Sequence, residues 1–88
     1  MKTENVKVEQ FNGVKNQLVI RTEKGTYFQS YDSIIVFIPI NGKTQLDRRF
    51  WDYSKTTGKY RNLFLSEDKK ETEAKIKNGT YLLTDLNK

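Results

Sequence analysis

Basic and aromatic side chains crowd into residues 48–65 of this chain, RRFWDYSKTTGKYRNLFL. The stretch holds five cations, the only Trp of the chain, two Tyr and two Phe. Lys and Arg neutralise phosphates, and exposed aromatic rings stack on unpaired bases. The pattern therefore predicts a basic aromatic surface for an anionic partner, most simply single-stranded nucleic acid. Its candidate residues are Arg48, Arg49, Trp51, Tyr53, Lys55, Lys59 and Arg61.

A second interpretation assigns the same residues to folding. Large rings such as Trp51, Tyr60 and Phe64 are what a helix needs to dock on a sheet, and a small domain has few of them. We expect these three to pack in the core. Lys and Arg lie outside by default, so the cations also fit an ordinary solvated surface.

Other chemistries find little support in the sequence. Cys and His are absent, which removes disulfides, thiol nucleophiles and the usual zinc ligands. Thr56 and Thr57 before Gly58 lack the spaced glycines of a phosphate loop. We expect Asp47 and Asp52 to pair with the neighbouring arginines rather than with a metal. The sequence therefore predicts no enzyme, no cofactor and no metal site.

The first half of the chain predicts strands. Val6, Val8 and Phe11 alternate with charged residues, as in a half-buried edge strand, and Asn12-Gly13 then turns the chain. The runs NQLVIRT and TYFQSY form a hairpin around Glu23, Lys24 and Gly25. SIIVFIPI, apolar on both alternating faces, predicts a central strand covered on both sides. Asn41-Gly42 predicts a tight turn with two positive φ angles, returning the chain into the antiparallel strand KTQLD.

The second half predicts two helices and a last strand. Tyr60, Leu63 and Phe64 recur at helical spacing, which indicates a helix over residues 55–65 that Ser54 or Asp52 can cap. In SEDKKETEAKIKNG, acids precede bases, as the helix dipole favours. We expect ion pairs four residues apart there, Glu71 with Lys75 and Glu73 with Lys77. TYLLTDL then predicts a closing strand.

These elements give one α+β domain over residues 1–88. It has an antiparallel sheet of about five or six strands, two short helices in the C-terminal half and a closing C-terminal strand. Sixteen Lys and Arg against eleven Asp and Glu leave a net charge of +5, which favours an acidic partner or serves solubility. The longest apolar run, residues 34–40, is too short to span a bilayer. We expect a soluble, untargeted protein with no membrane partner.

The segment WDYSKTTGKYRNLFL resembles a motif of small uncharacterised proteins of tailed bacteriophages and prophages, of the type Tyr-Ser-x-Thr-Thr-x-Lys-Tyr-x-x-x-Phe-Leu. FQSYDSIIVFI resembles a strand segment of the same family, and the resemblance covers about residues 27–86. It brings no known activity. It implies an accessory product of a phage or mobile element, acting in the host cytoplasm, where such proteins bind nucleic acid or block a host protein.

Two functions follow as hypotheses. The first is a non-enzymatic accessory protein that binds nucleic acid through the basic aromatic surface. The alternative is an inhibitor of a host protein, such as a CRISPR effector or another defence nuclease. The cationic channel of such a nuclease would match an acidic face better than a chain of charge +5. An inhibitor can instead dock through exposed Trp51, Tyr53 and Arg49.

Overall fold

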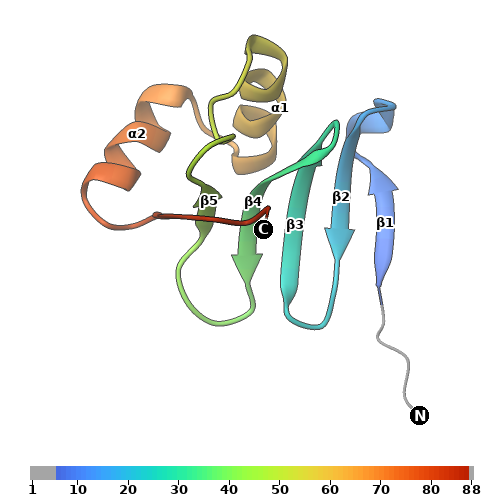
Figure 1. The fold of residues 1–88 in the computed structure, drawn as a ribbon, viewed down its shortest axis with the longest axis horizontal. Coiled ribbons are helices and arrows are strands. Elements are labelled where there is room, and N and C mark those ends of the chain that lie inside the picture. Colours follow the sequence, from blue (N-terminus) through green and yellow to red (C-terminus); the bar gives the residue numbers. More distant parts are fainter. Residues whose placement is uncertain (1–5, 88) are drawn as a thin grey trace.

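The computed structural model describes residues 6–87. Six strands form one sheet in the order β1-β2-β3-β4-β5-β6, and both helices follow β5 (Figure 1). This confirms the α+β class with two helices in the C-terminal half and a closing strand. The elements are β1 (Lys7–Gln10), η1 (Phe11–Gly13), β2 (Gln17–Arg21), β3 (Gly25–Ser30), β4 (Ser33–Pro39), β5 (Gln45–Asp47), α1 (Lys55–Leu65), α2 (Lys69–Lys77) and β6 (Leu82–Thr84).

The edge strand β1 differs from its prediction. It lies at the far edge of the sheet from both helices (Figure 1). All four of its residues are exposed, so the predicted half-buried face is wrong, because neither helix reaches it. The turn after β1 is confirmed: Asn12 and Gly13 have φ angles of 55° and 68°.

The β2–β3 hairpin forms as predicted, antiparallel and in continuous register. Gly25 lies at the start of β3 rather than in the middle of the turn. A Cβ atom there would lie 2.2 Å from the carbonyl oxygen of Ile38 on β4, so the close approach of the two strands requires glycine at this position.

Strand β4 is central in the sheet but is not covered on both sides. A bulge beside Phe28 and Gln29 shifts the register, and consecutive residues Ile35 and Val36 are both buried in the same core cluster. Phe37 is only partly buried and Ile38 is exposed. The apolar run of β4 therefore has two causes. The bulge places two consecutive residues in the core, and the apolar residues that follow lie on strand positions that are only partly covered.

The connections around β5 also correct the sequence prediction. Residues 40–44 join β4 to β5, and only Gly42 among them has a positive φ, so the expected two-residue turn at Asn41-Gly42 is wrong. β5 pairs antiparallel with β4 as expected, but β6 pairs with β5 in parallel. The chain after β6 returns to β4, where the Asn87 side chain accepts from the Ile34 amide and donates to the Ile34 carbonyl, at 2.7 and 2.8 Å.

Both helices begin at capped residues. The Ser54 side chain accepts from the Thr57 amide at 3.1 Å, which confirms Ser54 as the cap of α1. Asp68 caps α2 in a reciprocal capping box with Glu71. Neither helix in the described part of the chain has the length and apolar character to cross a membrane.

The ion pairs predicted along α2, Glu71 with Lys75 and Glu73 with Lys77, are not found among residues 6–87; Lys75 instead joins a cluster around Glu67. The Glu67 side chain, 2% exposed, accepts from Lys75 Nζ at 2.6 Å, from Thr72 Oγ1 at 2.6 Å and from the Tyr81 hydroxyl at 2.9 Å. Burial alone would raise the pKa of Glu67, but these hydrogen bonds outweigh it and hold that pKa below its ordinary value. The cluster ties the α1–α2 connection to the residue before β6.

The core lies between the helices and one face of the sheet. Val19, Phe28, Val36 and Leu46 are in register on successive strands and are all buried. The rings of Trp51, Tyr60 and Phe64 pack against this cluster, which confirms the core role expected for them. Phe64 stacks on Phe28 with ring centroids 5.2 Å apart.

Candidate nucleic-acid interface

The basic aromatic stretch begins at the end of β5, runs through a turn and continues into α1. At its start, the Asp47 side chain accepts from the amides of Arg49, Phe50 and Leu86 at 2.8–3.0 Å. Burial alone would raise the pKa of Asp47, but these hydrogen bonds prevail and lower it. Asp47 therefore fixes the turn through backbone amides, and the predicted pairing with arginine side chains is wrong.

The two arginines of this turn are exposed and lie beside acidic groups. Arg48 Nε is 3.9 Å from the Asp85 carboxylate, and Arg48 Nη2 donates to the Leu83 carbonyl at 3.4 Å. Arg49 lines a recess of about 200 Å³ together with Asp47 and Asp85. This end of the stretch carries little excess positive charge, which makes it the weaker half for phosphate binding.

The aromatic residues divide between core and solvent. Trp51 and Phe50 are half-buried and pack against the core cluster, so neither ring presents a free face of full size. Tyr53 is 69% exposed, and its ring meets the edge of Phe50 with centroids 5.3 Å apart. Of the four rings between residues 50 and 60, Tyr53 is the one placed for stacking.

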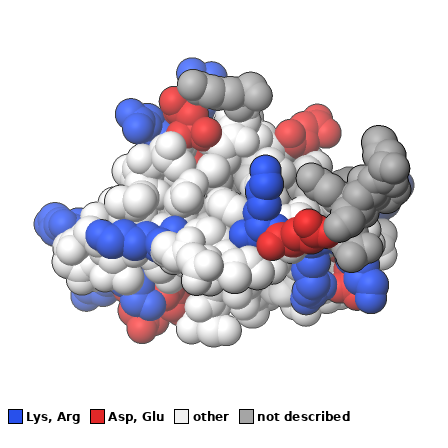
Figure 2. All heavy atoms as spheres, turned by 90° about the horizontal axis from the view of Figure 1, so that it is seen from below, with Lys and Arg blue, Asp and Glu red and all other residues white. Residues whose placement is uncertain are grey.

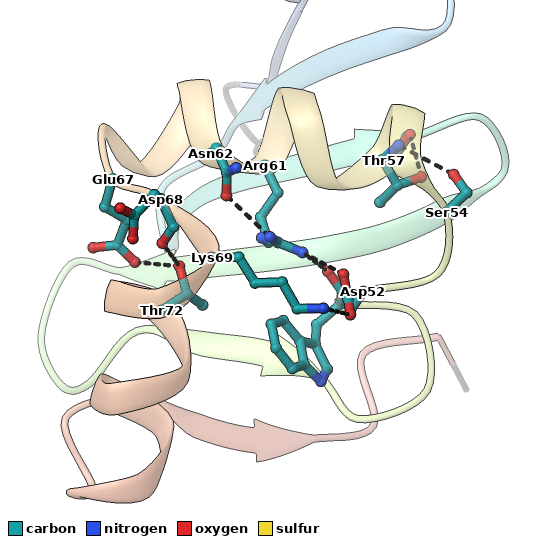
Figure 3. A network of polar contacts seen from close by, with 11 residues as sticks. Asp52, Ser54, Thr57, Arg61, Asn62, Glu67, Asp68, Lys69 and Thr72 are labelled. Atoms are coloured by element: carbon teal, nitrogen blue, oxygen red, sulfur yellow. Dashed lines mark hydrogen bonds and ion pairs between the residues drawn. The ribbon is translucent and has the colours of Figure 1, made fainter.

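Arg61 is buried, contrary to the exposed position that the sequence suggested. Its side chain is 1% exposed and lies 5.1 Å from the Trp51 ring. Nη1 donates to the Trp51 carbonyl at 2.6 Å and to Asp52 at 3.3 Å, and Nη2 donates to Asn62 at 2.9 Å (Figure 3). A guanidinium held in this way supports the turn and has no donor turned to a partner in solution.

Lys69 completes this network from α2, although no pattern in the sequence distinguishes it from other surface lysines. Its Nζ lies 2.7 Å from the second carboxylate oxygen of Asp52, so Asp52 joins both helices to the turn (Figure 3). Burial alone would raise the pKa of Asp52, and the bonds from Lys69 and Arg61 lower it. The hydrogen bond from Lys69 to Asp52 raises the pKa of Lys69.

This network lines one side of an open depression of about 500 Å³, which we call the cationic hollow. Its charged residues are four cations and one carboxylate, an excess of three positive charges. Lys55 and Lys59 are four residues apart on α1 and both are exposed, so they stand on one side of the helix beside the hollow. The lining residues are Asp52, Ser54, Lys55, Gly58, Lys59, Arg61, Asn62 and Lys69.

Basic side chains are dispersed on the side of the molecule that Figure 2 shows. Lys and Arg there are spread out and interleaved with Asp and Glu, with no single basic patch on that side (Figure 2). Within residues 6–87, no three of His, Cys, Asp and Glu come together as a metal ion would require. The cationic hollow with Tyr53 beside it is therefore the arrangement with the clearest binding chemistry in the described structure.

A family model matches residues 1–79 and bears the description family of unknown function, DUF8033. The chain belongs to this family. The match covers most of the chain, from the residues before β1 through both helices. No curated protein and no solved structure matches the chain. Membership therefore establishes an uncharacterised domain and supplies no activity.

Proposed function

We propose that this chain is a non-enzymatic accessory protein of a phage or prophage that binds nucleic acid in the host cytoplasm. The observation that carries the proposal is the excess of three positive charges in the cationic hollow next to exposed Tyr53. Phosphate contacts supply most of the affinity of non-specific nucleic-acid binding, and aromatic rings add stacking for unpaired bases. Single strands are accordingly the preferred form.

The charges that meet phosphates are those of Lys55 and Lys59. Arg61 and Lys69 both bond to Asp52, so their charges are engaged within the hollow. Lys55 is the first residue of α1 and Lys59 lies four residues later; both are exposed and line the hollow. Arg49 lies outside the hollow, in a recess that Asp47 and Asp85 also line.

The test is fluorescence anisotropy with a labelled single-stranded oligonucleotide and its duplex over a series of salt concentrations. Replacing Lys55 and Lys59 together with Ala removes two phosphate contacts. The slope of log K against log salt for single strands should fall in magnitude by about 1.4, at about 0.7 per phosphate. Affinity at low salt should fall with it.

A matched control removes the same charge elsewhere. Lys70 and Lys77 are exposed on α2, beside a different depression, so the double variant Lys70→Ala, Lys77→Ala changes the net charge equally. The proposal expects this control to bind nearly as the parent does. Equal weakening in both variants would show an effect of net charge alone, and no binding by the parent at low salt would refute the proposal.

A protein partner is a second candidate, because the open sheet face carries no charge along one row. Val8, Ile20, Tyr27, Phe37, Gln45 and Leu82 are in register across all six strands, opposite to the buried row. Tyr27 and Phe37 stack at its centre with ring centroids 4.3 Å apart. Uncharged aromatic centres are typical of protein interfaces, so this face suits an apolar surface on a host defence protein.

The charged variant Tyr27→Lys, Phe37→Glu separates the two candidates. It places charges on the open face and leaves the cationic hollow unchanged. If a host defence protein is the partner, this variant loses inhibition of that protein, while the Lys55, Lys59 variant retains it. The reverse pattern would assign the activity to nucleic-acid binding.

A further inference from the structure

The turn between β3 and β4 holds a tyrosine in a backbone conformation that tyrosine seldom adopts. Tyr31 has a φ of 55° in the two-residue connection between the paired residues Ser30 and Ser33. Gly, Asn and Asp are the residues that favour such positions, because a larger side chain crowds the backbone there. The conformation is fixed from both sides: the Tyr31 amide donates to the Asn16 carbonyl and the Tyr31 carbonyl accepts from Gln29 Nε2, each at 2.8 Å.

Core packing does not explain this conformation, since Tyr31 is 50% exposed. Tyr31 lines a recess of about 340 Å³ together with Tyr53, which is 69% exposed. Ser30 Oγ and Thr57 Oγ1 lie 3.0 Å apart in the buried floor and join the turn to α1. Two exposed tyrosines, one from the turn and one from the approach to α1, thus border one small cavity.

We propose that this recess receives one unpaired nucleobase, which stacks on Tyr31 and Tyr53. The proposal rests on the nucleic-acid binding proposed above and names the feature that the protein reads, a single accessible base. The volume lies near the lower end of the roughly 300–1,000 Å³ common for small-molecule sites, which suits one base rather than a longer ligand. A base paired within a duplex cannot enter it.

The position of the recess relative to the cations supports this assignment. Ser54 lines both the recess and the cationic hollow, so the two sites adjoin. A strand whose base enters the recess can extend its backbone toward Lys55. Asp32 also lines the recess, and its carboxylate repels phosphate there but accepts a hydrogen bond from an exocyclic amine. Cytosine, adenine and guanine should therefore bind better than thymine or uracil.

The variant Tyr31→Asn tests the recess without disturbing the turn, because Asn favours the same backbone conformation and lacks the ring. Its affinity for a single-stranded deoxycytidine oligonucleotide should fall by about 5- to 150-fold, the range of stacking on one base. Binding of a duplex should change less than twofold. Thermal unfolding should occur at the same temperature as in the parent or higher.

A second pair of variants tests the recess at Tyr53, which lies outside the turn between β3 and β4. Tyr53→Ala should weaken single-strand binding as Tyr31→Asn does, whereas Tyr53→Phe keeps the ring and should retain it. Parent-like affinity in Tyr31→Asn and Tyr53→Ala, with a parent that binds, would overturn the recess and leave the proposed function standing. Absence of binding by the parent itself would refute the proposed function and this inference together.

Discussion

Replacing Arg61 with Ala should destabilise the fold, because the guanidinium supports the turn before α1 from a buried position. The substitution removes the donors to the Trp51 carbonyl, Asp52 and Asn62. Asp52 is 34% exposed and Lys69 still neutralises it from 2.7 Å, so the cost arises chiefly at the Trp51 carbonyl and the Asn62 side chain, which lose their donor at about 1–3 kcal/mol for each group. We expect a loss of about 3 kcal/mol in the free energy of unfolding.

This loss is a large share of the stability of such a chain. At about 0.05–0.15 kcal/mol per residue, a chain of 88 residues has about 4–13 kcal/mol in total. A domain of this size loses about 4–8 °C in melting temperature per kcal/mol, so the variant should melt about 12–24 °C lower. Urea unfolding gives the free energy directly, and the single Trp, Trp51, lies beside the Arg61 guanidinium and reports local loosening by its fluorescence.

The matched control is Lys59→Ala, which removes one cation from the same helix at an exposed position. Its free energy of unfolding should change by less than about 0.5 kcal/mol. An Arg61→Ala protein within about 0.5 kcal/mol of the parent would refute the structural role of the guanidinium. That result would instead favour the sequence-based prediction that Arg61 belongs to the binding surface.

Three further predictions concern stability. Gly58→Ala should add about 0.5–1 kcal/mol in urea unfolding, since the new Cβ would lie an ordinary 3.7 Å from the Arg61 guanidinium and helices favour Ala. Stability should decline below about pH 4.5 in acid titrations followed by circular dichroism. Asp47 and Glu67 have lowered pKa values in the folded state, so they lose their stabilising contribution as pH falls through those values. A flat profile down to about pH 3 would contradict this. Glu67→Gln should lower the free energy of unfolding in urea by about 2 kcal/mol, because one amide oxygen replaces a carboxylate that accepts from three side-chain donors. An unchanged urea midpoint would show that the donors find other partners.

The elements that the sequence predicted well are those set by local patterns. The α1 helix follows from apolar spacing and from the cap Ser54, and α2 follows from the order of acids before bases; these signals act within a few turns of the chain. The antiparallel pairs from β2 to β5 join neighbouring segments. The parallel pairing of β6 with β5 connects residues more than thirty positions apart and has no local signal.

The candidate site was predictable in composition but not in geometry. Arg61 resembles any other surface cation in the sequence, and its burial depends on a carbonyl and two side chains that the fold collects around it. Lys69 meets Asp52 across two helices. Tyr31 escaped notice because only the backbone conformation of its turn, with φ at 55°, shows that its position is unusual.

Helix geometry explains why one basic stretch serves two purposes. Lys55 and Lys59 are four residues apart, so they share a face of α1, and both are exposed. Arg61 comes two residues later, more than half a helical turn around the axis, and faces inward onto Trp51. Because the guanidinium and Lys69 are both bonded to the Asp52 carboxylate, the cations of the hollow that are left to meet a partner are the two lysines. Affinity should therefore depend on Lys55 and Lys59, and stability on Arg61, within a single helix.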